Sequence, residues 1–147
     1  MEVKSCLVTQ SHTTITKLYG KQKDGTYHTG VDIKATSVYS ICNCVVTNVS
    51  KEASGTYIVT CQYNSKRCFR YGNLDSVFKS VNDVVLIGHQ LGTTKDVVHF
   101  EDCITDQPTM FPFRFGGRTY YKVDPLNIVT GIVPIFSSTK NPFNQCP

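Results

Sequence analysis

Two imidazoles and a carboxylate constrain this chain most strongly. His28 and Asp32 lie four residues apart in the segment HTGVD, and His99 follows about seventy residues later in the segment VVHFE. On a straight strand His28 and Asp32 would lie about 13 Å apart, whereas two ligands of one zinc ion bring their donor atoms within about 3–4 Å. If they act together, the backbone bends between them. We predict that Gly30 permits this bend, because glycine adopts dihedral angles that other residues avoid.

The chemistry of these three side chains favours a metal. Histidine nitrogens and carboxylate oxygens are common zinc ligands, and catalytic zinc sites typically use three protein ligands. His28, Asp32 and His99 are therefore a candidate zinc site. From these residues alone, the favoured interpretation is three unrelated polar residues of a β-protein.

The composition is that of an ordinary globular domain. The 147 residues are 40% hydrophobic and 18% charged, which suits one domain with its own core. The net charge of +4 fits an acidic partner, but lysine and arginine are scattered, so we expect no nucleic-acid arm. No apolar run approaches the roughly 20 residues of a membrane span, and none at the start resembles a secretory signal. We therefore expect no membrane span and no signal peptide.

The seven cysteines are read as reduced thiols. Their number is odd, and we expect no secretory signal, so disulfides are not the default expectation. Cys42, Cys44, Cys61 and Cys68 lack the paired C-x₂-C spacing of zinc ribbons. We predict that they are small buried hydrophobic residues.

Local patterns predict an all-β fold with antiparallel sheets. β-Branched and aromatic residues indicate strands at residues 45–49, 56–63, 84–87 and 97–101, with glycines marking the turns. Residues 73–80 could form one short turn of helix. We expect a single domain over residues 15–130, a polar N-terminal segment over 1–14 and an extended, proline-containing C-terminal arm over 131–147.

Alternation along residues 97–101 predicts which side chains face a site. Val97, His99 and Glu101 share one face, and Val98 and Phe100 point to the core. A second group is ambiguous, because it could line a groove or pack into a core or loop: Phe111, Phe113, Phe115, Tyr120 and Tyr121. These aromatic residues lie in the segment 105–121, which we read as a loop that borders the groove.

The chain resembles the lysostaphin-type (M23) zinc metallopeptidases, which cut peptides of bacterial peptidoglycan. The segments that resemble family motifs, in order, are YG at 19–20, HTGVDI at 28–33, VYS at 38–40, CVV at 44–46, YGNL at 71–74, residues 84–92, VVHFE at 97–101 and VDPL at 123–126. The resemblance spans residues 19–128. It implies antiparallel sheets that form a groove over a barrel-sandwich-like core, with His28, Asp32 and His99 as the zinc ligands and peptidoglycan as the partner.

Two positions depart from the family pattern. The two histidines that assist catalysis in the family fall on Asn73 and Val97. Asn73 can donate a hydrogen bond to an oxyanion but cannot shuttle protons, and Val97 can do neither. Because loss of an acid–base group removes about 10²–10⁴ in rate, we expect weak or absent peptidase activity at a retained zinc site.

Three neighbouring groups could compensate for the lost histidines. We expect His89 to occupy an exposed turn and Asp96 to point away from the metal face. Glu101 shares the metal face, and we expect it to orient a ligand.

Two functions remain open. The first is a peptidoglycan-directed protein on a phage tail, made in the host cytoplasm and able to bind or slowly cleave the wall. The second is a structural virion subunit that keeps the fold and has lost the chemistry. A third reading, a biotinyl- or lipoyl-type module, is disfavoured because no lysine occupies residues 88–92.

Overall fold

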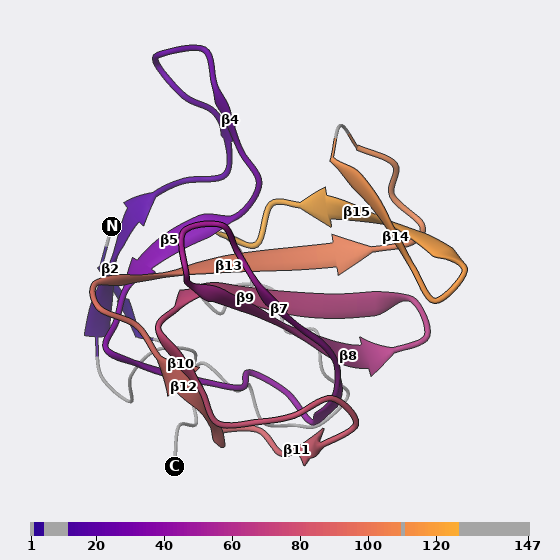
Figure 1. The fold of residues 1–147 in the computed structure, drawn as a ribbon. Helices are drawn as coiled ribbons and strands as arrows, with labels where there is room; N and C mark the ends of the chain where they lie inside the picture. Colours follow the sequence, from indigo (N-terminus) through magenta and orange to yellow (C-terminus); the bar gives the residue numbers. More distant parts are fainter. Residues whose placement is uncertain (1, 5–11, 110, 127–147) are drawn as a thin grey trace.

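The chain folds as antiparallel strands (Figure 1). The structure, a computed structural model, describes residues 2–4, 12–109 and 111–126, and side chains from residue 14 onward within them. The strands are β1 (Glu2–Lys4), β2 (His12–Lys17), β3 (Gly20–Lys21), β4 (Tyr27–His28), β5 (Val31–Lys34), β6 (Ser37–Tyr39), β7 (Cys44–Lys51), β8 (Tyr57–Asn64), β9 (Arg67–Leu74), β10 (Ser76–Val77), β11 (Val84–Val85), β12 (Gln90–Thr93), β13 (Val97–Ile104), β14 (Pro112–Phe115) and β15 (Arg118–Val123). The all-β prediction is confirmed.

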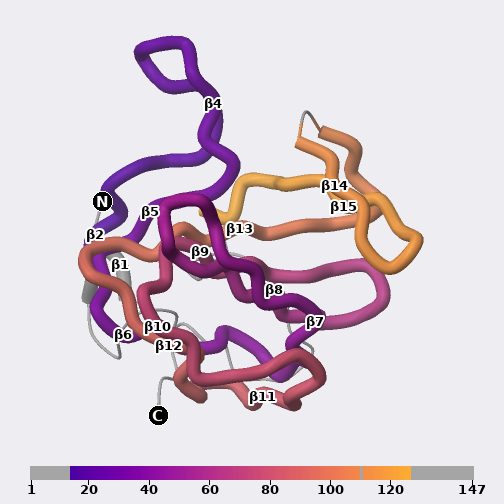
Figure 2. Tube along the Cα trace, viewed as in Figure 1, coloured from indigo at the N-terminus to yellow at the C-terminus, as the bar shows by residue number. Residues whose placement is uncertain are grey.

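One large sheet organises the molecule. Its strand order is β1-β2-β5-β13-β9-β8-β7-β11, and β15 pairs with β13 and, on its other side, with β14. A second sheet has the order β10-β12-β6, and β3 and β4 form a separate hairpin that projects from the body (Figure 2). Strand β13 therefore lies inside the large sheet, between β5 and β9, and this position places His99 among its partners.

The hydrophobic core lies between the two sheets. The large sheet contributes Ile33, Val98 and Phe100, and the small sheet contributes Val38 and Leu91, all fully buried. Val98 and Phe100 point inward while Val97 and His99 stay partly exposed, as alternation predicted. The core thus fixes β13 in one register, because a slip of one residue would expose its apolar side chains.

The helical turn predicted over residues 73–80 is wrong. Strand β9 continues to Leu74, and β10 follows at once, with Ser76 opposite Thr93 and Val77 opposite Gly92. Backbone pairing with β12 satisfies the hydrogen-bonding groups that a helix would have paired internally.

Two predicted strand and turn assignments also need correction. The strand predicted over residues 84–87 ends at Val85, and residues 86–89 form the turn that leads into β12. Gly72 and Gly92 lie inside β9 and β12 and not in turns.

The proposed segment boundaries remain predictions. Strand β2 begins at His12, within the segment 1–14, and pairs with both β1 and β5. The arm expected over residues 131–147 lies outside the described residues. Within residues 2–4, 12–109 and 111–126, no helix has the length and apolar character to cross a membrane.

The position of the core predicts that two phenylalanines contribute very differently to the free energy of unfolding. Phe100 is fully buried and stacks on Phe69 with ring centroids 5.7 Å apart, whereas Phe78 is 55% exposed. We expect Phe100→Ala to lower the free energy of unfolding by about 3–5 kcal/mol, because it leaves a cavity. Phe78→Ala should change it by less than about 0.5 kcal/mol. Urea unfolding measures both, and equal losses would contradict this placement of the core.

Candidate metal centre

Three strands bring the predicted ligands together. His28 ends β4, Asp32 lies in β5, and His99 lies in β13 directly opposite Asp32 in the antiparallel register. Val31 and Ile33, on either side of Asp32, are fully buried, so alternation turns Asp32 to the opposite face of the sheet. The pairing of β5 with β13 therefore determines the position of two of the three donors.

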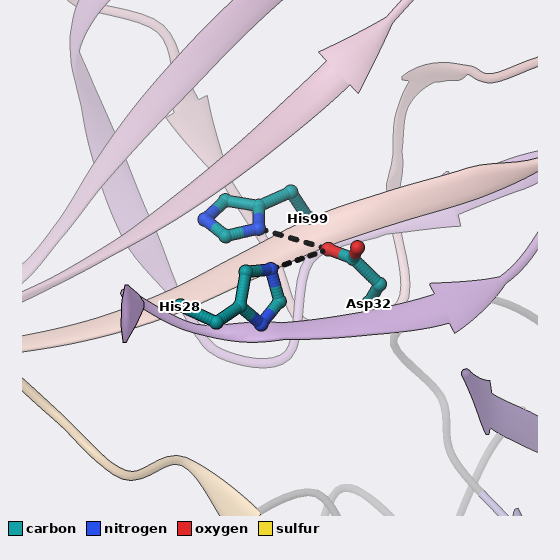
Figure 3. A group of neighbouring side chains, drawn as sticks. All are labelled: His28, Asp32 and His99. Atoms are coloured by element: carbon teal, nitrogen blue, oxygen red, sulfur yellow. Dashed lines mark hydrogen bonds and ion pairs between the residues drawn. The ribbon is translucent and has the colours of Figure 1, made fainter. Parts of the chain in front are cut away.

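The donor atoms converge on one point (Figure 3). Asp32 Oδ1 lies 3.1 Å from His28 Nε2 and 2.9 Å from His99 Nδ1. One ligand atom from each of the three residues lies within 4.8 Å of the others. The side chains are 11%, 21% and 25% exposed for His28, Asp32 and His99, so the group is sheltered but reachable. This arrangement could hold a metal ion.

The remaining nitrogen of each ring has an acceptor. His28 Nδ1 donates to the carbonyl oxygen of Leu18 at 3.0 Å, and His99 Nε2 lies 2.9 Å from Glu101 Oε2. A carbonyl oxygen can only accept, so His28 Nδ1 bears the proton and Nε2 faces Asp32. Metal-binding histidines typically have such a partner on the second nitrogen, which fixes ring orientation. The predicted role of Glu101 in orienting a ligand agrees with this contact.

Gly30 is required for a reason other than the predicted one. The backbone bends at residues 29–30, as expected, but Gly30 does not adopt a positive φ. A Cβ at this position would lie 2.1 Å from the carbonyl oxygen of Phe100. Gly30 therefore allows the bend to approach the backbone of β13, next to His99.

Opposite charges on neighbouring side chains stabilise the ionised forms of His99, Glu101 and Asp32. Burial opposes the charged ring of His99, but hydrogen bonds to Asp32 and Glu101 outweigh burial and raise its pKa to about 9. Burial likewise opposes ionised Glu101, yet His99, Lys122 and Arg70 together lower its pKa to about 2. Burial also acts against ionised Asp32, but the two histidines lower its pKa. The site is therefore a compact set of opposite charges.

Asn73 and Val97 contact each other. Asn73 Nδ2 donates to the carbonyl oxygen of Val97 at 2.8 Å, and the Thr94 hydroxyl lies 2.8 Å from Asn73 O and 2.7 Å from Val97 O. Asn73 also has a φ of 64°, a left-handed conformation that asparagine tolerates better than most residues. At least one N–H of the Asn73 amide is thus engaged in holding the start of β13 to β9.

The other predicted groups lie as follows. His89 is exposed in a turn, as expected. Asp96 precedes β13, is exposed and pairs with Lys34 Nζ at 2.9 Å. The predicted burial of Cys42, Cys44, Cys61 and Cys68 is confirmed, and Cys103 is also buried.

The segment 105–121 is mostly a packed hairpin. Its strands β14 and β15 extend the large sheet, and Phe113 stacks on Tyr120 with ring centroids 5.5 Å apart. Phe111 instead contacts Tyr27, the residue before His28, at 6.0 Å between centroids. Of this aromatic group, Phe113 and Tyr120 therefore pack within the hairpin, whereas Phe111 lies beside the metal centre.

Comparisons with known proteins identify the fold. No protein-family model and no curated protein matches the sequence. Among solved structures, a mutant of the catalytic domain of the prophage-encoded M23 protein EnpA from Enterococcus faecalis has a TM-score of 0.59 and 22% identity, over 77% of this chain and 88% of that one. The catalytic domain of lysostaphin, an antimicrobial peptidase from Staphylococcus simulans, has a TM-score of 0.60 and 17% identity, over 80% and 92%. The chain has the lysostaphin-type (M23) fold.

The M23-type fold is also found outside structures named as peptidases. A chain of the SpoIIQ–SpoIIIAH pore-forming complex matches with a TM-score of 0.62 and 17% identity, over 86% of this chain and 90% of that one. Identities at this level establish the fold alone, so activity must be argued from the site.

Sequence reasoning missed the groups around Glu101. Arg70 Nη1 lies 2.9 Å from Glu101 Oε1, Lys122 Nζ lies 3.5 Å from Oε2, and Thr29 Oγ1 donates to Oε2 at 2.5 Å. These contacts join segments from four parts of the chain, and strand register determines them. The sequence did contain one signal. Glu101 directly follows Phe100, a predicted core residue of the strand that carries His99, and a buried carboxylate needs a cationic partner.

Gly30 and Gly72 offer a matched test of the site's construction. Both lie beside β13, but a Cβ at Gly72 would meet His99 O at 3.5 Å and His99 Cβ at 3.6 Å, which are ordinary contacts. We expect Gly30→Ala to lower the free energy of unfolding by about 1–3 kcal/mol and to weaken zinc binding, because β13 must shift. Gly72→Ala should change both little. Urea unfolding and zinc titration measure the effects, and tolerance of Gly30→Ala would refute the close approach.

Proposed function

We propose that this chain is a peptidoglycan-directed protein with an M23 fold, a zinc ion held by His28, Asp32 and His99, and weak or absent peptidase activity. The convergence of three donor atoms, each within 4.8 Å of the others, is the observation that supports it most directly. The residues fit zinc, because two imidazole nitrogens and one carboxylate oxygen form a common catalytic ligand set. When bound, zinc supplies a Lewis acid that can polarise a peptide carbonyl.

The surroundings of the metal centre supply little proton transfer. An open polar hollow of about 380 Å³ is lined by Ser54, Gly55, Thr56, Asn73, Asp75 and Lys95. Asn73, which lines this hollow, directly follows Gly72, the residue opposite His99. Asn73 can present one amide N–H to an oxyanion, and Val97 offers no proton-transfer group. Slow turnover is therefore the expected limit of such a site.

We further propose that the protein is associated with a phage tail and is made in the host cytoplasm. The similarity to a prophage-encoded M23 protein supports this placement. Peptidoglycan is the proposed partner because the named peptidases share the fold.

A second candidate function is that of a structural virion subunit that uses the fold for assembly. The hydrogen bond from the Asn73 amide to the backbone carbonyl of Val97 favours it, because the side chain at position 73 ties β9 to β13. The match to a chain of a pore-forming complex also favours it. Release of new amino groups from purified bacterial wall would contradict this second candidate.

Zinc binding is the primary test. We expect the native protein to bind about one equivalent of zinc and to lose it in His99→Ala. His89→Ala provides the control, because it removes an exposed imidazole from a turn away from the ligands. Equilibrium dialysis with metal analysis measures the stoichiometry. A native protein that binds no zinc, or a His99→Ala variant that binds it equally, would overturn the proposed site.

Restoring the missing imidazoles tests the chemistry. We expect the double variant Asn73→His with Val97→His to raise cleavage of purified peptidoglycan by about 10²–10⁴, because each position gains a group that can transfer protons. The matched control, Asn73→Ala with Val97→Ala, disrupts the same contacts without adding imidazoles. If the restored protein binds zinc and remains as inactive as the control, the proposal that these two positions limit turnover is wrong.

A further inference from the structure

We propose that Arg70 and Lys122 are positioning residues for the metal centre, and that they act through Glu101 on His99. The proposal rests on the proposed zinc site and adds the β14–β15 hairpin to its construction. It predicts that two cations with no place in the ligand set control how well the site binds metal.

Glu101 connects these cations to His99. Its side chain is only 6% exposed, and its two oxygens have different partners. Oε1 accepts from Arg70 Nη1 at 2.9 Å, whereas Oε2 lies 2.9 Å from His99 Nε2. Lys122 Nζ approaches Oε2 at 3.5 Å. A carboxylate fixed at one oxygen holds the other in place, so the cations, together with the Thr29 hydroxyl that donates to Oε2 at 2.5 Å, position the acceptor for His99.

The β14–β15 hairpin holds the two cations. The guanidinium of Arg70 lies 4.9 Å from the centroid of the Phe113 ring, and Lys122 Nζ lies 5.8 Å from the same centroid. Phe113 in turn stacks on Tyr120. Cations over aromatic faces are attracted to the ring, and this attraction limits their freedom. The hairpin thus supplies both the strand that carries Lys122 and the ring under Arg70.

Orientation of His99 needs this support because the imidazole has two contacts to satisfy. Its Nδ1 faces Asp32 Oδ1 at 2.9 Å, and its Nε2 faces Glu101 Oε2 at the same distance. If Glu101 can rotate away, Nε2 keeps only its longer contact with the Thr29 hydroxyl at 3.2 Å, and Nδ1 is held less firmly toward the other donors. Partners of metal-binding histidines typically affect metal affinity about 10- to 100-fold.

The same two strands contain a matched control. Arg67 of β9 binds Asp102 of β13 through two contacts, at 2.9 and 2.6 Å. Arg67 and Arg70 are 20% and 18% exposed, and Asp102 and Glu101 are 1% and 6% exposed. Asp102 follows Glu101 directly and so points to the opposite face of the strand. The two ion pairs are alike in burial. Arg67 makes two contacts to its carboxylate and Arg70 makes one, and the contact with His99 belongs to Glu101.

The experiment compares zinc affinity in Arg70→Gln, Lys122→Gln and Arg67→Gln, with thermal unfolding of each metal-free protein alongside. We expect Arg70→Gln to weaken zinc binding about 10- to 100-fold and Lys122→Gln to weaken it less, because its contact is longer. Arg67→Gln should lose stability, since it leaves Asp102 buried and unpaired, but keep zinc affinity within about twofold of the native value. Arg70→Lys, which retains the charge, should recover part of the loss.

Cobalt substitution adds a readout that a merely structural role would not alter. The visible absorption of bound Co²⁺ reports ligand geometry, and we expect it to change in Arg70→Gln but not in Arg67→Gln. Equal zinc affinity in the native and Arg70→Gln proteins, or equal losses in Arg70→Gln and Arg67→Gln, would overturn the positioning role. If Arg70→Gln does not fold, Lys122→Gln decides, and native affinity there overturns the proposal. A native protein that binds no zinc contradicts the proposed function itself.

Discussion

The antiparallel pairing of β5 with β13 is the interaction on which the site depends. It places His99 opposite Asp32 and lets Val98, Phe100 and Ile33 bury their side chains on the other face. Since a shift of one residue would reverse both faces, the core that stabilises the domain also fixes the distance between two donors. The register of β5 against β13 therefore determines both the packing of the core and the spacing of two candidate metal donors.

Much of this arrangement could be predicted from local pattern. Alternation in VVHFE places His99 outside and Phe100 inside, and a bend in HTGVD is needed if His28 and Asp32 act together. The choice of these three residues as donors comes from the resemblance to the M23 family. The role of Gly30 was misjudged, because its requirement arises from a carbonyl group seventy residues away. Arg70 and Lys122 could not be predicted, because their contacts with Glu101 depend on which strands are neighbours and in which register. The helical turn over residues 73–80 failed for the same reason: pairing with β12 decides that segment.

The site combines a complete donor set with an incomplete set of proton-handling groups. His28, Asp32 and His99 each have fixed surroundings, whereas Asn73 and Val97 bind each other through amide and carbonyl. The proposed function follows from this combination: a site that retains metal but turns over slowly or not at all. This division is compatible with a fold shared both by peptidases and by a component of a pore-forming complex. The choice between the two proposed functions therefore depends on the chemistry at two residues, and not on the fold.

The most direct test of the central claim is zinc K-edge X-ray absorption on the zinc-loaded protein. If His28, Asp32 and His99 hold the ion, the spectrum will show nitrogen and oxygen neighbours at about 2.0–2.2 Å, with the outer-shell pattern of two imidazoles. Sulfur neighbours at about 2.3 Å would show that the buried cysteines bind the metal instead, and would contradict the account.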